Sequence, residues 1–376
     1  MTNLFFYGSL RDEELLRIVL GDEEARIELR QAELADHSAT WAKGHPFPMI
    51  AKISGERATG LLAMNLNDDQ VARINFYEGG FSYDLGKTTA STDGGHVECE
   101  VYYPQVGLFE RGEKWHLSDW QRDWGDLSRE AAKEAMSYFG DITAETLVQR
   151  FPRIRARADS RIRAQSQPAP MTVRSGKTSQ DLTIEQRETS HSGFYALDSM
   201  HLRHTKFDGS KSELLRREGF KSSDATIVLP YDPVTDTILM VEQIRMGPIG
   251  RADPVPWCLE PVAGLVDPGE GPEETAHREA LEEAGVSFTA LETVANGYSS
   301  PGASTGYFFL YVGLCDLSDH QSDQAGIPDE GEDICSHIIA FDHAMELVDT
   351  GEINVLPTIL CLNWLAHHRD RLRAGS

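Results

Sequence analysis

The sequence lacks long apolar runs and any paired spacing of cysteines. No stretch approaches the ~20 apolar residues that a membrane-spanning helix needs, and we expect residues 307–317, the most apolar segment, to form a buried strand. The five cysteines are scattered and form no CxxC pair, which argues against a disulfide framework or a zinc site. The first residues, MTNLFFYGSL, lack the basic start of a signal peptide. We therefore expect a soluble, cytoplasmic protein with no membrane partner.

Positive charge is also scarce. Lysine and arginine total 35, against 60 aspartates and glutamates, and the formal net charge is -25. Because nucleic-acid backbones require a basic surface, this balance predicts no nucleic-acid partner. An acidic enzyme can still handle phosphates of a small molecule if divalent cations and a few arginines neutralise them locally.

The length of 376 residues and the changes in composition along the chain predict two domains. The polar, proline-bearing segment QSQPAP at residues 165–170 is typical of an exposed linker, so we place one domain at 1–164 and the other at 171–376. Strands mixed with a few helices predict an α+β fold. The expected strands are residues 4–7, 60–64, 97–103, 225–230, 237–241, 307–312 and 334–341, with helices at 272–284 and 354–371.

Six arginines and a single aspartate lie between residues 150 and 163. One interpretation is a patch that binds anions or nucleic acid. The other, which we favour given the acidic chain, is a solvated helix face, with packing on an acidic partner domain as one form of it. We expect Pro152 to interrupt this helix, because proline removes a backbone donor.

The strongest chemical signal is GLVDPGEGPEETAHREALEEAGV, at residues 264–286. Pro272 suits the first turn of a helix, and Gly285 suits its end. Glu279 and Glu283 are four residues apart and share a helix face, with Glu282 beside them. Carboxylates crowded in this way repel one another unless a cation lies among them, and such oxygen ligands favour Mg²⁺ or Mn²⁺. We also expect Arg278 to pair with Glu270.

This segment fills every fixed position of the Nudix box, Gx5Ex7REUxEExGU, and therefore resembles the Nudix hydrolases. Almost all of residues 190–375 resembles the ADP-ribose pyrophosphatase branch of that family, including Pro301, which follows Val286 by 15 residues. The other matching stretches are residues 201–204, 207–209, 215–218, 228–233, 241–245, 257–260, 262–264, 299–302 and 329–333.

The resemblance implies a Nudix α/β/α sandwich that hydrolyses ADP-ribose to AMP and ribose 5-phosphate, or cleaves a related nucleoside diphosphate sugar. Metal ions would be held by Glu279, Glu283 and the Ala263 carbonyl, with Glu282 helping to hold them and also acting in catalysis. The diphosphate would face Arg217 and Arg245, whose forks suit phosphate oxygens, close to Pro301. The base would come from the late acidic loop, as Glu330 or Glu332, and we favour Glu330.

Two further points concern this half. Phe194 lies where the family stacks an aromatic ring on adenine, although a buried phenylalanine in a strand explains it equally well. After Gly302 the family usually carries an acid at the fifth or sixth residue, whereas this chain reads ASTGY, so the metal number or substrate preference is expected to differ. The family usually exchanges N-terminal strands, which implies a homodimer.

Residues 1 to about 120 resemble the γ-glutamylcyclotransferase family. The string Tyr7-Gly8-Ser9-Leu10 matches its first loop, FYEGG around Glu78 matches its acid-bearing turn, and Tyr83 falls where the family often has a tyrosine. The resemblance implies a mixed β-barrel with helices.

Chemically, one carboxylate suffices to move the proton when a γ-glutamyl amine attacks its own γ-carbonyl, and Glu78 is the candidate. The backbone of residues 8–10 is suited to hold the substrate carboxylate. Three readings stay open for this half: a second activity, the main activity, or a non-catalytic ligand-binding or dimerisation module. The fused arrangement also resembles bacterial Nudix-type tellurite-resistance proteins, although no residue explains such chemistry.

Overall fold

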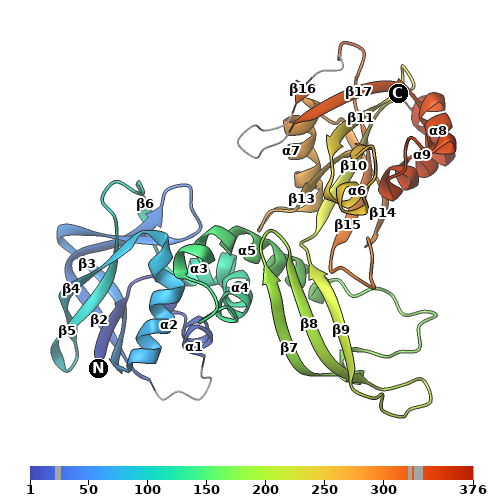
Figure 1. Cartoon of the computed structure of the whole chain (residues 1–376). Helices are drawn as coiled ribbons and strands as arrows, with labels where there is room; N and C mark the ends of the chain where they lie inside the picture. The colour runs from blue at the N-terminus through green and yellow to red at the C-terminus, as the bar shows by residue number, and fades with distance from the viewer. Residues whose placement is uncertain (22–26, 321–323, 326–332, 376) are drawn as a thin grey trace. The chain divides into compact units, whose positions relative to one another are not determined.

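The structure is a computed structural model that describes residues 1–21, 27–320, 324–325 and 333–375. It divides into two compact units, residues 1–170 and 171–376 (Figure 1). The last helix of the first unit continues through Ser166, held by bonds from Gln167 N–H and the Ser166 hydroxyl to the Arg163 carbonyl. The first two residues of the predicted linker are therefore helical. All five cysteines are free thiols, and no described helix is both long and apolar enough to cross a bilayer.

The first unit is built around a closed, mixed β-barrel. Its strands follow the order β3-β1-β5-β4-β2, and β2 pairs with β3 to close the ring, while a sixth strand extends β2. Only β1 and β5 run parallel. The strands are β1 (Thr2–Phe6), β2 (Glu28–Ala42), β3 (Pro48–Leu66), β4 (Tyr83–Thr92), β5 (Gly95–Pro104) and β6 (Arg111–Lys114). Apolar side chains that alternate along these strands, such as Phe5, Leu62 and Val101, fill the barrel.

Helices cover the barrel and share a second core with it. They are α1 (Glu13–Leu20), α2 (Asp68–Glu78), α3 (Leu117–Trp120), α4 (Asp126–Met136) and α5 (Ala144–Ser166), with short turns η1 (Ser9–Arg11), η2 (Gly79–Phe81) and η3 (Gln121–Gly125). Helix α5 passes through Pro152 without ending, contrary to our prediction. Proline removes one hydrogen bond, and burial of Leu147, Ile154 and Ala158 outweighs that loss.

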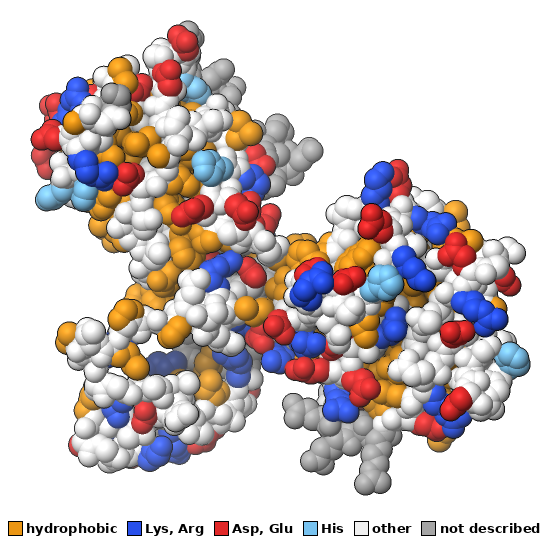
Figure 2. All heavy atoms as spheres, turned by 180° about the vertical axis from the view of Figure 1, so that it is seen from behind, with side chains coloured by type: hydrophobic (Ala, Val, Ile, Leu, Met, Phe, Trp, Pro, Cys, Tyr) orange, Lys and Arg blue, Asp and Glu red, His pale blue; other side chains and the backbone are white. Residues whose placement is uncertain are grey.

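The arginines of α5 are not a solvated face. Arg157 is buried, and its Nε donates to Glu134 of α4 over 2.8 Å. Arg161 donates to Glu130 over 2.7 Å and to Glu134 over 2.8 Å. The interpretation that we favoured is therefore wrong for these two residues, because α4 supplies the carboxylates that pair with them. Acidic and basic side chains are interspersed over the face shown in Figure 2.

The second unit contains a large mixed sheet and a separate three-stranded sheet. The large sheet has the order β14-β15-β10-β11-β17-β16, with β12 paired to β11 and β13 paired to β10. Its strands are β10 (Ala225–Asp232), β11 (Thr237–Ile244), β12 (Trp257–Glu260), β13 (Val262–Leu265), β14 (Ala290–Tyr298), β15 (Tyr307–Leu314), β16 (Gln324–Ala325) and β17 (Ile334–Ala340). The smaller antiparallel sheet comprises β7 (Leu182–Ser192), β8 (Ala196–His204) and β9 (Leu215–Lys221), after a turn η4 (Ser179–Asp181).

Helices pack on both faces of the large sheet. Val228 of β10 points toward α7 (Pro272–Ala284), whereas its neighbours Ile227 and Leu229 join the core formed with α8 (Phe341–Thr350) and α9 (Leu356–Ala374). A short helix, α6 (Met246–Arg251), follows β11. The predicted α+β class and the α/β/α sandwich of the second half are confirmed, as is the mixed barrel of the first half.

Candidate active sites

Helix α7 carries the acidic motif of the second unit, and local signals set both of its ends. Pro272 is its first residue, and the N–H of the preceding Gly271 donates to Glu274 over 2.7 Å in a capping box. Gly285 follows the helix in the left-handed conformation, with φ of 63°. These signals define the predicted helix 272–284 to the residue.

Arg278 joins the loop before α7 to the carboxylates on it. Its Nε and Nη2 donate to the two oxygens of Glu270 over 3.1 and 3.0 Å, which confirms the predicted pair. Its Nη1 donates to Glu279 over 2.7 Å and to Glu282 over 3.0 Å. Burial opposes the charge of Glu270, yet the bonds from Arg278 and Thr275 hold the pKa of that carboxyl below its usual value.

Glu279 and Glu283 converge on one point of strand β13. A Cβ atom on Gly264 would lie 1.8 Å from Glu279 Oε1, so the absence of a side chain there lets Glu279 lie against the strand. Glu283 is buried, and its Oε2 accepts a bond of 3.1 Å from the Ala263 N–H. Three of the four predicted metal ligands, Ala263, Glu279 and Glu283, thus meet at this strand, and the fourth, Glu282, is joined to Glu279 through Arg278.

The chemistry of these donors fits a divalent cation. Carboxylate and carbonyl oxygens are the ligands that hard divalent ions prefer, and two of the three carboxylates already share a positive partner in Arg278. Among the described residues, no three His, Cys, Asp or Glu side chains are gathered as closely as a complete metal site requires. The carboxylates of Glu279, Glu282 and Glu283 are nevertheless oxygen donors of the kind that suits a divalent ion.

Replacing Gly264 with alanine is expected to displace the Glu279 carboxylate and lower hydrolytic activity by about tenfold or more, since misplacing a catalytic group by ~1 Å costs up to a hundredfold. The clashing atoms are the end of a flexible side chain, so the thermal unfolding midpoint should change little. Gly297→Ala in β14 is the matched control, because a Cβ there meets nothing within 4 Å. Equal turnover by both variants would show that Glu279 need not lie against β13.

Of the two predicted diphosphate-binding arginines, Arg217 lies in the smaller sheet and Arg245 lies between β11 and α6. Arg245 immediately precedes α6, and its Nε donates to Glu260 of β12 over 2.6 Å. Arg217 is exposed on β9, where its Nη1 donates to the Arg216 carbonyl over 2.8 Å. Strand β9 reaches the loop that contains Pro301, because the Phe220 N–H donates to the Ala303 carbonyl over 2.8 Å.

Phe194 lies in the turn between β7 and β8, and its side chain is 54% exposed. Its ring packs edge-on against Tyr195. The alternative of a buried strand residue is therefore wrong, and adenine stacking stays a prediction. Pro301 is exposed in the loop between β14 and β15. Glu330 and Glu332, the two candidate bases, lie outside the described residues.

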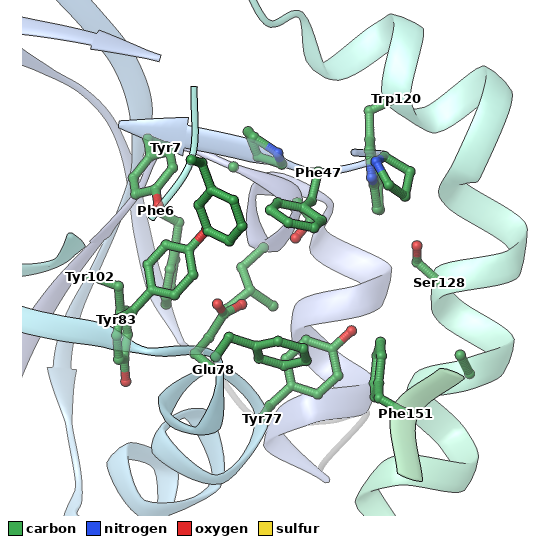
Figure 3. A pocket seen from close by; sticks show the side chains of 18 of the residues that line it. Phe6, Tyr7, Phe47, Tyr77, Glu78, Tyr83, Tyr102, Trp120, Ser128 and Phe151 are labelled. Atoms are coloured by element: carbon green, nitrogen blue, oxygen red, sulfur yellow. The ribbon is translucent and has the colours of Figure 1, made fainter. Parts of the chain in front are cut away.

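The first unit contains a cavity of about 250 Å³ that gathers all six of its candidate site residues (Figure 3). They are Tyr7, Gly8, Ser9, Leu10, Glu78 and Tyr83. The turn η1 begins with Gly8 as its N-cap, and a Cβ on Gly8 would lie 2.6 Å from the Pro48 ring. Because the first N–H groups of a helical turn have no partner within it, this turn presents donors suited to a carboxylate.

Glu78 is the one acidic side chain among the residues that line this cavity. Figure 3 shows its carboxylate among the rings of Tyr7, Tyr83 and Tyr77. Burial raises the pKa of Glu78 to about 7. Burial also raises the pKa of Tyr7, as do the hydrogen bond that it shares with Tyr83 and the nearby Glu78 charge. A carboxyl group with a pKa near neutrality is suited to take up and release a proton.

Sequence reasoning missed the aromatic and helical walls of this cavity. Phe47 and Tyr77 come from the barrel region, whereas Trp120, Ser128, Ala131, Phe151 and Arg155 come from α3, α4 and α5. Phe151 and Arg155 are four residues apart on α5 and therefore share a helix face. This four-residue spacing was the one sequence signal for the helical wall of the cavity. We overlooked it because we treated the arginines between residues 150 and 163 as a single cluster.

Comparisons with known proteins agree with both halves of this description. Residues 221–356 match the model of the NUDIX domain, and residues 4–122 match that of the gamma-glutamyl cyclotransferase, AIG2-like family. The ADP-ribose pyrophosphatase of Escherichia coli (strain K12) is 36% identical over 206 residues, which are 55% of this chain and 97% of that protein. The GDP-mannose pyrophosphatase of Escherichia coli (strain HS) is 29% identical over 188 residues, covering 50% and 95%.

A solved structure described as an ADP compounds hydrolase is 21% identical and covers 53% of this chain and 100% of its own, with a TM-score of 0.41. On the family match and the 36% identity, the chain belongs to the Nudix family. It is a Nudix hydrolase that also carries an AIG2-like gamma-glutamyl cyclotransferase domain ahead of its Nudix domain.

Proposed function

We propose that the second unit hydrolyses the diphosphate of ADP-ribose, or of a related nucleoside diphosphate sugar, with Mg²⁺ or Mn²⁺ as cofactor. The observation that carries this proposal is the convergence of Glu279 and Glu283 on the Ala263–Gly264 segment of β13. The names of the relatives, which include ADP-ribose pyrophosphatase and GDP-mannose pyrophosphatase, support a diphosphate flanked by two sugars.

In this mechanism Glu279, Glu283 and the Ala263 carbonyl would hold the metal, and Glu282 would assist them. When bound, the metal neutralises phosphate charge and lowers the pKa of water. Arg278 fixes the direction of Glu279 and Glu282 through bonds of 2.7 and 3.0 Å.

Arg217 and Arg245 are proposed to bind phosphate oxygens through their planar forks. The Nε of Arg245 already donates to Glu260, so Arg245 would bind phosphate oxygens through the remaining N–H groups of its guanidinium. The proton of the attacking water passes to Glu330 or Glu332, which stays a prediction. Positioning and charge neutralisation supply most of the rate enhancement in such reactions.

A panel of nucleoside diphosphate compounds tests the proposal. The purified chain is incubated with Mg²⁺ or Mn²⁺ and ADP-ribose, GDP-mannose or other nucleoside diphosphate sugars, and the products are identified by mass. We expect ADP-ribose to give AMP and ribose 5-phosphate, which places the broken bond within the diphosphate. If no member of the panel were turned over with either ion, the proposal would be abandoned.

A second function is favoured by the cavity of the first unit. We propose that this unit releases 5-oxoproline from a γ-glutamyl compound, with Glu78 moving the proton. The α-amine nitrogen of the γ-glutamyl group forms a bond to the carbonyl carbon of its own γ-amide. The bond from that carbon to the leaving nitrogen then breaks, and Glu78 passes the proton from the attacking amine to the leaving amine.

The position of Glu78 in the wall of this cavity, with its pKa raised to about 7 by burial, supports this role over that of a ligand-binding or dimerisation module. No water or cofactor is consumed in the reaction. The homodimer and the link to tellurite resistance stay predictions from resemblance, and the cytoplasmic location and the domain limits 1–164 and 171–376 stay predictions from the sequence.

A further inference from the structure

The cavity of the first unit extends beyond the residues that match the cyclotransferase family. The match ends at residue 122, yet Ser128 and Ala131 of α4 and Phe151 and Arg155 of α5 also line the cavity. These helices are part of the same folded core, because Leu127, Ala131, Leu147 and Ile154 pack with residues of α1 and α2. The added helices therefore build one wall of the site.

Arg155 is the one cation among the residues that line the cavity. Its guanidinium lies over the Trp124 ring, 5.4 Å from the centroid, and it forms no hydrogen bond or ion pair within the part of the chain that the structure describes. Its neighbours on α5 differ, since Arg157, Arg161 and Arg163 each bond to a carboxylate. Burial lowers the pKa of Arg155 from its usual value, and the nearby charges of Tyr77 and Asp159 offset this only in part.

The carboxylate already in the cavity does not neutralise Arg155. Burial is the one cause that raises the pKa of Glu78, and the charge of Arg155 does not offset it. Burial is the main cause that raises the pKa of Tyr77, the Glu78 charge adds to this shift, and the Arg155 charge opposes it. Glu78 ends α2 and Arg155 lies on α5, so the two groups enter the cavity from different helices, and Arg155 is available to an incoming anion.

We propose that Arg155 binds the α-carboxylate of the leaving amino acid, so that the first unit prefers γ-glutamyl dipeptides over γ-glutamyl amines that lack this carboxylate. The aromatic wall formed by Trp120, Phe151 and Phe47 would surround the side chain of that amino acid, which favours apolar and aromatic residues. This inference rests on the cyclotransferase proposed above. In the reaction, a γ-glutamyl dipeptide yields 5-oxoproline and one free amino acid, with atoms and charge balanced.

Two substrates that differ in one group test the inference: γ-glutamylphenylalanine, and the same compound with its C-terminal carboxylate replaced by a carboxamide. The whole chain is assayed for 5-oxoproline release, and calorimetry measures the binding of each compound. We expect KM to be about 10- to 100-fold lower for the carboxylate form, as hydrogen bonds to a charged group imply. We expect kcat to be similar for the two compounds.

The variants are Arg155→Gln, Arg155→Lys and the control Arg150→Gln, which changes an arginine of the same helix that does not line the cavity. Arg155→Gln should remove the preference by raising KM for the carboxylate form alone. If Arg155→Gln turns over the carboxamide at the wild-type rate, the variant protein is folded. Arg155→Lys should restore part of the preference, and Arg150→Gln should retain all of it.

Each outcome decides between the two proposals. If the wild type turns over both compounds without preference, or if the preference survives in Arg155→Gln, the role of Arg155 is overturned and the cyclotransferase stands. If no 5-oxoproline appears but binding depends on the carboxylate and on Arg155, the subsite stands and the cyclotransferase fails. If neither compound binds nor reacts, both proposals are overturned.

Discussion

Replacing Glu283 with glutamine is expected to lower the rate of ADP-ribose hydrolysis by roughly a thousandfold at a fixed Mg²⁺ concentration, because a bound metal contributes several kcal/mol of charge stabilisation in such sites. Glutamine keeps the size of the side chain and the oxygen that accepts from the Ala263 N–H over 3.1 Å. It removes only the negative charge that faces the ion. Initial rates measured across a Mg²⁺ titration check the effect, and the variant should require more metal as well as turn over more slowly.

Glu273→Gln is the matched control for this experiment. Glu273 lies in the first turn of the same helix and is exposed, so its loss should leave hydrolysis within about twofold of the wild type. Thermal unfolding of both variants separates loss of chemistry from loss of fold. Full activity of Glu283→Gln at the same Mg²⁺ concentration would rule out this carboxylate as a ligand of the metal.

Replacing Glu78 with glutamine is expected to lower 5-oxoproline release by about a hundredfold to ten-thousandfold, the usual contribution of a positioned acid or base. In the wild type the base is active when ionised. Because its pKa is raised to about 7, the rate should rise with pH through about 7 and fall tenfold per pH unit below it. A pH–rate profile for a γ-glutamyl substrate measures this dependence. A flat profile between pH 6 and 8 would argue against Glu78 as the base.

The same variant should also change the dependence of stability on pH. The folded-state pKa of Glu78 lies above the usual value of 4.5, so the neutral carboxyl is favoured in the fold. This contribution is complete below about pH 4.5 and is lost as pH rises through about 7. Relative to Glu78→Gln, the wild type should lose up to about 3 kcal/mol of unfolding free energy between pH 4.5 and pH 8. Glu56→Gln, an exposed position on β3, should show no such difference.

The elements that could be predicted from the sequence are those set by local signals. Pro272 and Gly285 mark the two ends of α7, and the eight-residue spacing of Glu270 and Arg278 implied their pairing. Strand-like alternation indicated β10, and a continuous apolar run indicated β15. These features depend on residues close in the chain, whose geometry a helix or strand determines.

The features that escaped prediction depend on distant residues. Closure of the barrel requires β2 to pair with β3 while β1 lies parallel to β5, and no local pattern specifies that combination. The cavity joins Tyr7 to Phe151, which are far apart in the sequence. The arginines of α5 were misjudged because their partners, such as Glu134, lie on another helix. Phe194 was ambiguous because an aromatic residue at a turn looks the same in sequence as one in a core.

Helices α4 and α5 have a practical consequence for anyone who wishes to move this barrel into another protein. Leu127, Ala131, Leu147 and Ile154 fill the core beside α1 and α2, so a fragment cut at residue 122 would expose the surface that they cover. Such a fragment would be expected to aggregate. We expect the portable module to be residues 1–166, longer than the family match, and this segment includes Arg155, to which we assign the substrate preference proposed above.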